Sequence, residues 1–240
     1  MEEKLNGIVV SATDYRENDK IINVFTPERG VISASLKGVK KAGAKLKFAA
    51  APFCLAEFMF SVKGDKRTVI GASLTDSFYP LRENLKKFYC GATALEFVKK
   101  FVREEMSSPE LFILVVNTLK DLAYGKEDCL SVTSEFLVSA LKFSGYALNI
   151  GGCLSCGKTD FTRVFFDVST GGFYCEECFG KEMREINPET YAAIVKAERG
   201  EPLSPRQSAF ALRFLNYYVT AKTEETLNAL KELGRLTENV

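Results

Sequence analysis

Two pairs of cysteines in the second half of the chain constrain its fold more than any other feature. The first pair is Cys153 and Cys156, the second is Cys175 and Cys178, and eighteen residues lie between the pairs. Each C-x-x-C segment forms a tight turn that directs two thiolates to one point, and two such turns complete a tetrahedron of ligands. This spacing predicts a zinc site with four cysteine ligands.

The residues between the two pairs favour a β-hairpin. Residues 163–168 are mostly aromatic and β-branched, residues 169–172 read Ser-Thr-Gly-Gly, and Phe173-Tyr174 follows. This order predicts a strand, a turn and a return strand, which would bring the second cysteine pair back to the first. Four thiolates fill the usual coordination of zinc, and the chain contains no histidine. We therefore expect one structural zinc ion, which would supply about 10 kcal/mol or more of the folding free energy of a small hairpin.

Other functions can be assigned to the same residues. Residues 152–159 match the phosphate-loop pattern G-x-x-x-x-G-K-[ST], which would indicate a nucleotide hydrolase. A phosphate loop needs a helix that begins at its Lys-Thr, whereas residues 161–166 favour a strand. A redox dithiol of the C-x-x-C type and four unrelated thiols are the remaining alternatives to a metal site.

Composition and the remaining cysteines indicate the compartment. The chain has 240 residues, of which 46% are hydrophobic and 26% are charged, as in an ordinary globular protein. Its N-terminus is acidic and lacks the apolar segment of a signal peptide, and its longest aliphatic run, residues 111–116, is too short to cross a bilayer. Cys54, Cys90 and Cys129 lie in apolar surroundings and are expected to be buried free thiols. We expect a protein of the reducing cytoplasm.

The first eighty residues have the pattern of short strands. The segment 53–62 alternates most clearly, with Cys54, Ala56, Phe58 and Phe60 on one face. Five strands in about seventy residues favour a small closed β-barrel of the OB type. The predicted strands are Leu5–Ala12, Lys20–Thr26, Val31–Leu36, Phe53–Val62 and Lys66–Leu74.

Positive charge is concentrated in this predicted barrel. Residues 30–70 carry eight lysines or arginines and two acids, a net charge of +6 in a chain whose total is +1. Cations that replace counterions, close to aromatic side chains, are typical of a surface that binds single-stranded nucleic acid. The alternative is a solvated loop without a partner. The candidate nucleic-acid-binding residues are Lys37, Lys40, Lys41, Lys45, Lys47 and Arg67.

From about residue 80 onward the pattern becomes helical. Apolar residues recur every three or four positions, and several segments begin with a capping residue followed by proline. We predict an α+β protein with an OB-fold domain at residues 1–80 and a helical domain at residues 81–240 that carries the zinc hairpin at residues 150–181. The predicted helices span 82–104, 109–124, 130–144 and 188–199, and two more begin at Ser204-Pro205 and at Thr223-Glu224-Glu225.

Residues 7–41 contain a series of short distinctive segments: Gly7-Ile8-Val9-Val10, Tyr15-Arg16-Glu17-Asn18-Asp19, Val24-Phe25-Thr26, Gly30 and Lys37-Gly38-Val39-Lys40-Lys41. Together they resemble the N-terminal signature of the RecO family of bacterial recombination mediators. The chain length, the order of strands before helices and the four cysteines also fit, although some members of the family lack the metal site.

This resemblance implies a more specific function than composition alone predicts. Proteins of the RecO family bind single- and double-stranded DNA, anneal complementary strands, join RecR and contact the acidic tail of single-stranded DNA-binding protein. With RecR they help RecA to load, so RecA is an indirect partner. The resemblance implies no catalytic residue, so we expect a nucleoid-associated protein that is not an enzyme. The acids between Asp14 and Asp19 suit a polar inter-strand loop better than a magnesium site.

Overall fold

In the computed structural model, residues 1–238 are described, and their packing forms two units. The first unit consists of residues 1–84 and 95–123, and the second consists of residues 85–94 and the chain from 124 onward. Part of the helical region thus packs with the barrel, so these packing units are a different division of the chain from the predicted domains at residues 1–80 and 81–240, which stay a prediction. Within residues 1–238, no helix combines the length and the apolar composition that crossing a membrane requires.

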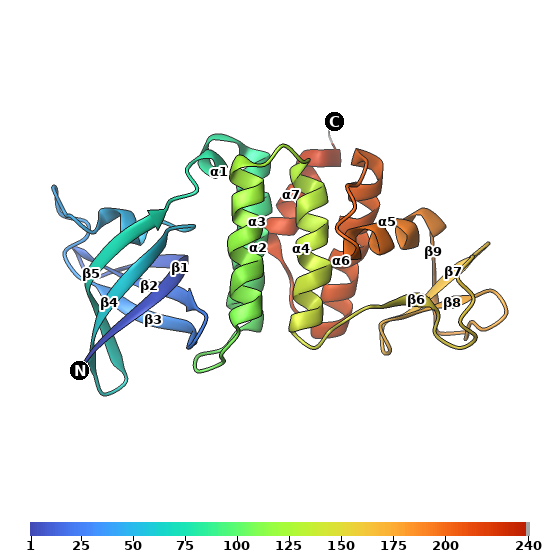
Figure 1. Cartoon of the computed structure of the whole chain (residues 1–240), viewed down its shortest axis with the longest axis horizontal. Helices are drawn as coiled ribbons and strands as arrows, with labels where there is room; N and C mark the ends of the chain where they lie inside the picture. The colour runs from blue at the N-terminus through green and yellow to red at the C-terminus, as the bar shows by residue number, and fades with distance from the viewer. Residues whose placement is uncertain (239–240) are drawn as a thin grey trace. The chain divides into compact units, whose positions relative to one another are not determined.

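Five strands form a closed barrel in the order β1-β2-β3-β5-β4, with β4 returning to β1 (Figure 1). The pairs are antiparallel except β3 and β5, which are parallel where Ala34 faces Arg67. This confirms the OB-type barrel that the sequence predicts. The strands are β1 (Glu2–Tyr15), β2 (Asp19–Thr26), β3 (Gly30–Leu36), β4 (Leu55–Lys63) and β5 (Lys66–Asp76).

The barrel interior follows from the two-residue period of its strands. Ala56, Phe58 and Phe60 of β4 are fully buried in a cluster with alternate residues of β2 and β3, as the alternation predicts. The rings of Phe58 and Phe60 lie 5.8 Å apart between centroids. Burial of each such ring stabilises the fold by about 1.5–3 kcal/mol.

The helices follow the predicted pattern with two corrections. The predicted helix 82–104 is two helices, because Asn84 is extended between them. The last helix does not begin at residues 223–225, because Glu224 adopts a left-handed conformation and ends the preceding helix. The helices are α1 (Pro80–Glu83), α2 (Leu85–Phe101), α3 (Pro109–Tyr124), α4 (Cys129–Phe143), α5 (Pro188–Glu198), α6 (Pro205–Thr223) and α7 (Asn228–Glu238), and a short 3₁₀ helix, η1, spans Lys47–Ala50.

Residues 95–123 pack on the outer face of the barrel. Val24 of β2 faces the barrel interior, so the next residue, Phe25, points outward. Phe25 is nevertheless fully buried, and the ring of Phe112 on α3 packs edge-on against it, with 5.4 Å between the ring centroids. Gly30 pairs with Glu104 in an isolated bridge. A Cβ at Gly30 would lie 2.1 Å from the backbone oxygen of Arg103, so only glycine permits this approach.

The second unit contains a small sheet of four strands in the order β6-β8-β7-β9. Its centre is the predicted hairpin, β7 (Val164–Asp167) and β8 (Gly172–Cys175), and the prediction omitted β6 (Asn149–Cys153) and β9 (Arg184–Ile186). Phe166 and Phe173 of the hairpin lie 4.8 and 5.7 Å from the ring of Phe214 on α6. The hairpin therefore shares an aromatic core with helix α6.

Candidate nucleic-acid interface and metal centre

The segment from the end of β3 to the first residue of η1, residues 37–47, carries five lysines and no acidic residue, and we call it the lysine loop. It is a series of turns rather than an extended chain: the Lys41 N–H donates to the oxygen of Gly38 at 3.2 Å, and the Ala44 N–H donates to that of Lys41 at 3.2 Å. Val39 at one end and Ala49 just beyond the other are buried in the barrel core. These apolar anchors direct the five exposed lysine side chains outward.

The turn between β1 and β2 is bound to the lysine loop. The Gly38 N–H donates to Asp19 Oδ1 at 2.8 Å, and the Lys40 N–H donates to the carbonyl oxygen of Asn18 at 3.1 Å. Lys40 Nζ also lies 2.9 Å from Asp14 Oδ2. The two loops therefore form one surface, although the contacting residues are 19 to 26 positions apart in sequence.

Asp14 and Asp19, at the two ends of this turn, serve these contacts. Lys40 and then Lys20, by hydrogen bonds to the carboxylate, lower the pKa of Asp14 below its ordinary value. Among residues 1–238, side chains able to hold a metal gather in groups of three or more at the four cysteines and not at residues 14–19. The polar loop expected for this segment is therefore the better description.

Arg67 does not share the surface of the five lysines. Its side chain is 11% exposed, and its guanidinium pairs with Glu104, with Glu105 at 3.3 Å and with Glu3 at 3.7 Å. These glutamates already balance its charge within the first unit. We therefore remove Arg67 from the candidate nucleic-acid-binding residues.

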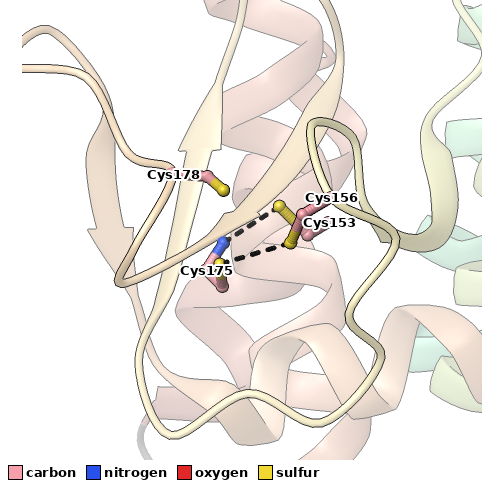
Figure 2. A group of neighbouring side chains, drawn as sticks. All are labelled: Cys153, Cys156, Cys175 and Cys178. Carbon is pink, nitrogen blue, oxygen red and sulfur yellow. Dashed lines mark hydrogen bonds between the residues drawn. The ribbon is translucent and has the colours of Figure 1, made fainter.

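The four predicted metal ligands converge. All four Sγ atoms lie within 4.8 Å of one another, and those of Cys156 and Cys175 are 3.8 Å apart. Figure 2 shows the two pairs facing each other from separate segments of chain. A tetrahedral ion with bonds of about 2.3 Å to sulfur separates its ligands by about 3.8 Å. The donor set and its spacing therefore fit one tetrahedral metal ion.

The backbone around the first pair has the geometry of a metal-binding turn. The Cys153 N–H donates to the oxygen of Lys158 at 2.8 Å, and the Gly157 N–H donates to that of Cys153 at 2.8 Å. Gly152 has a φ of +118°, and a Cβ there would lie 3.0 Å from the Lys158 oxygen. Glycine is thus required where the chain enters the turn.

Backbone dipoles favour the thiolate form of Cys153. Burial by itself raises the pKa of this thiol, but N–H groups of Cys156, Cys175 and Ser155 outweigh burial and lower the pKa to about 6. The Cys175 N–H approaches the sulfur at 3.5 Å. A thiolate is the form that binds metal, so the pocket is prepared for a cation.

The phosphate-loop interpretation of the same residues is wrong. The chain after Lys158 and Thr159 is not helical and enters strand β7 at Val164, so no helix dipole faces a phosphate. Lys158 Nζ is instead 3.1 Å from Glu176 Oε1, and this glutamate raises the pKa of the lysine.

The three other thiols are buried and free, as the sequence predicts. Burial raises the pKa of Cys54 to about 11, so this thiol stays protonated near neutral pH. Cys90 and Cys129 lie together in the second unit, where a hydrogen bond with Cys129 raises the pKa of Cys90.

The sequence did not indicate a groove that the second unit contains. A cavity of about 490 Å³ lies between α4, α6 and α7. Leu130, Leu212 and Leu230 form apolar parts of its lining, and Arg213 and Lys231 contribute positive charge. These residues come from three helices, so no local pattern in the sequence could have grouped them.

Comparison with known families and proteins covers most of the chain. The family model "Recombination protein O N terminal" matches residues 1–78, and "Recombination protein O C terminal" matches residues 82–231. DNA repair protein RecO of Acetivibrio thermocellus is 27% identical over 98% of this chain and 88% of its own length. The RecO proteins of Desulforamulus reducens, at 28%, and Anaeromyxobacter sp. strain K, at 29%, align over 93% and 97% of this chain and 92% and 97% of their own lengths.

Proposed function

Because the chain belongs to the RecO family, we propose that it acts in DNA repair and recombination by binding single- and double-stranded DNA and annealing complementary strands. The observation that supports this most is the lysine loop, which holds five exposed cations on a rigid series of turns. The lysines would neutralise phosphates on two strands and reduce the repulsion between them while the strands search for register. No residue is assigned a catalytic role in this function, which is not that of an enzyme.

Salt dependence tests the proposal directly. If the five lysines contact single-stranded DNA, log affinity should fall with log salt concentration with a slope of roughly −3 to −4. Replacement of all five by alanine should flatten the slope and slow annealing. Fluorescence anisotropy of a labelled oligonucleotide across a salt series measures the slope. The variant carries Lys37→Ala, Lys40→Ala, Lys41→Ala, Lys45→Ala and Lys47→Ala.

A matched control separates local contact from net charge. Five exposed lysines outside the loop can be replaced by alanine to give the same net charge, and this control should keep the native slope. Equal loss in both variants, or none in the loop variant, would remove the loop from DNA binding. The control lysines are Lys99, Lys120, Lys126, Lys142 and Lys181.

We also propose that the four cysteines hold one zinc ion in a structural role. Four thiolates at tetrahedral spacing are the donor set that zinc prefers in structural sites, and they leave no ligand position for a substrate. Elemental analysis of the purified protein would identify the metal. A content well below one zinc per chain would contradict the assignment.

The groove of the second unit supports a proposal about partners. A cavity lined partly by leucines, to which Arg213 and Lys231 contribute positive charge, complements an acidic peptide such as the acidic tail of single-stranded DNA-binding protein. We propose that this tail docks there, and that the chain with RecR then helps RecA to load onto the coated strand.

Charge reversal tests this docking. Lys231→Glu should weaken binding of a labelled tail peptide by about tenfold or more, because like charges would then face each other. Lys142→Glu changes an exposed lysine of α4 that does not line the groove, and it should have no effect. Equal peptide affinity in the two variants would place the tail elsewhere.

The proposed location is the cytoplasm, in association with the nucleoid. Three buried free thiols suit a reducing compartment, and DNA binding would concentrate the protein on the chromosome. Microscopy of a fluorescent fusion would show this, and a signal that avoids DNA would contradict it.

A further inference from the structure

Tyr15 is an exposed aromatic residue beside the lysine loop. Within residues 1–84, most aromatic side chains are buried or partly buried, and Tyr15 and Tyr79 are the exposed ones, at 43% and 58%. Of these two, Tyr15 ends β1 at the turn that is bound to the lysine loop. An exposed ring next to a group of cations is the arrangement on which unpaired bases stack.

The backbone conformation of the neighbouring residue, Arg16, goes together with a contact between its guanidinium and the Tyr15 ring. Arg16 has a φ of +55°, a left-handed conformation that is unfavourable for a residue with a side chain. In this conformation its guanidinium carbon lies 5.1 Å from the centroid of the Tyr15 ring. One face of the ring is thus covered by a cation, and the exposed area that remains suits a flat apolar ligand.

The turn is also held in place. Asp14 pairs with Lys40, Asp19 accepts from the Gly38 N–H, and Asn18 accepts from the Lys40 N–H, so both sides of Tyr15 are bound to the loop. The backbone on both sides of Tyr15 is therefore restrained, which reduces the conformational freedom that is lost when the ring binds a base.

We propose that Tyr15 is a stacking platform for an unpaired base of single-stranded DNA, with the adjoining phosphates on the lysine loop. This inference rests on the proposed DNA binding and extends it, because it names a residue that distinguishes single strands from duplexes. In a duplex the bases stack on one another and cannot reach the ring. Tyr15 would therefore favour the unpaired strands that annealing requires.

Substitution at Tyr15 tests the platform. Tyr15→Ala should weaken single-stranded DNA binding by roughly 5- to 150-fold, the range for loss of one base–aromatic stack. Duplex affinity should not change, and Tyr15→Phe should bind as the native chain does, because it keeps the ring. Single-strand affinity of Tyr15→Ala equal to that of Tyr15→Phe would overturn the proposal.

Fluorescence gives an independent measurement. The chain contains no tryptophan, so Tyr15→Trp introduces a single reporter whose emission a stacked base would quench. Tyr124→Trp, at an exposed tyrosine of the helical region, is the control and should not be quenched by oligothymidylate. Equal quenching at both positions would contradict stacking at Tyr15. If the five-lysine variant loses affinity while Tyr15→Ala does not, this inference fails and the proposed function stands; if the native chain binds no DNA, both fail.

Discussion

Asp14 restrains two of the cations near the lysine loop. Its carboxylate lies 2.9 Å from Lys40 Nζ and 3.3 Å from Lys20 Nζ. These lysines lower the pKa of Asp14 in the folded state. The ionised carboxylate therefore stabilises the fold at pH values above its pKa in the unfolded chain, and this stabilisation is lost as the pH falls through its pKa in the folded chain. The pair is therefore present at neutral pH, where it competes with phosphate for both lysines.

Removal of this charge should strengthen DNA binding. Asp14→Asn frees Lys40 and Lys20, so single-stranded DNA affinity should rise, and Lys20, which is not among the five loop lysines, should add one phosphate contact and steepen the salt slope by about 0.7. Asp65→Asn makes the same charge change at the exposed β4–β5 turn and is the control for anisotropy titrations. If the two variants bind alike, the Asp14 pair does not restrain the lysines.

Arg67 shows how far residue type alone can mislead. It belongs to the cationic segment 30–70, and its charge is what nominated it for DNA binding. Its actual partners, Glu104 and Glu105, lie almost forty residues away in sequence. The net charge of a sequence segment does not predict which of its lysines and arginines form ion pairs with residues distant in the sequence.

At the scale of elements, the proposed metal and side-chain packing would stabilise different parts of the cysteine hairpin. Its ligands lie at the ends of β6 and β8 and in the turns that follow, while Phe166 and Phe173 pack on α6. The aromatic core holds the strands, and the metal would hold the two turns. Each therefore stabilises a different part of the same element.

Metal removal should consequently loosen the hairpin without unfolding the chain. A chelator should lower the free energy of unfolding of the second unit by less than the 10 kcal/mol or so that isolated zinc peptides lose, because the aromatic core remains. Hydrogen exchange should rise at residues 149–186 and stay unchanged in the barrel. Cys175→Ser should show the same rise, with no further effect of chelator. Unchanged exchange at 149–186 would contradict a structural metal.

The strands that the prediction omitted share a physical cause. β6 contains Gly151-Gly152 and β9 has three residues, so neither shows the alternation that marks a strand. β6 pairs in parallel with β8, and because no tight turn joins the two strands, the sequence between them does not predict this pairing. β7 and β8 were predictable because a tight turn joins two adjacent segments rich in aromatic and β-branched residues.

At the scale of the whole molecule, the boundary between the packing units falls inside the helical sequence. Residues 95–123 belong to the first unit although they are helical like those of the second. Phe25 on the barrel is fully buried, and Phe112 of α3 is among the side chains that pack on it. A barrel without this segment would expose that apolar face to water.

Fragments of the chain test this boundary. A fragment of residues 1–123 should unfold at a higher urea concentration than a fragment of residues 1–84, because it keeps Phe25 covered. Phe112→Ala in the longer fragment should remove part of the difference, by about 1–3 kcal/mol for a partly buried ring. Equal midpoints for the two fragments would show that the barrel is independent of residues 95–123.

The sequence by itself determined the elements and the chemistry that depend on neighbours in the chain. Alternation specified the five barrel strands, and the spacing of Cys153, Cys156, Cys175 and Cys178 specified a convergent ligand set, because turn geometry is local. Tertiary structure decided which charges remain available and which rings are exposed. Lys40 meets Asp14, Arg67 meets Glu104, and Tyr15 lies beside the lysine loop, because closure of the barrel brings distant segments together and no local period encodes those contacts.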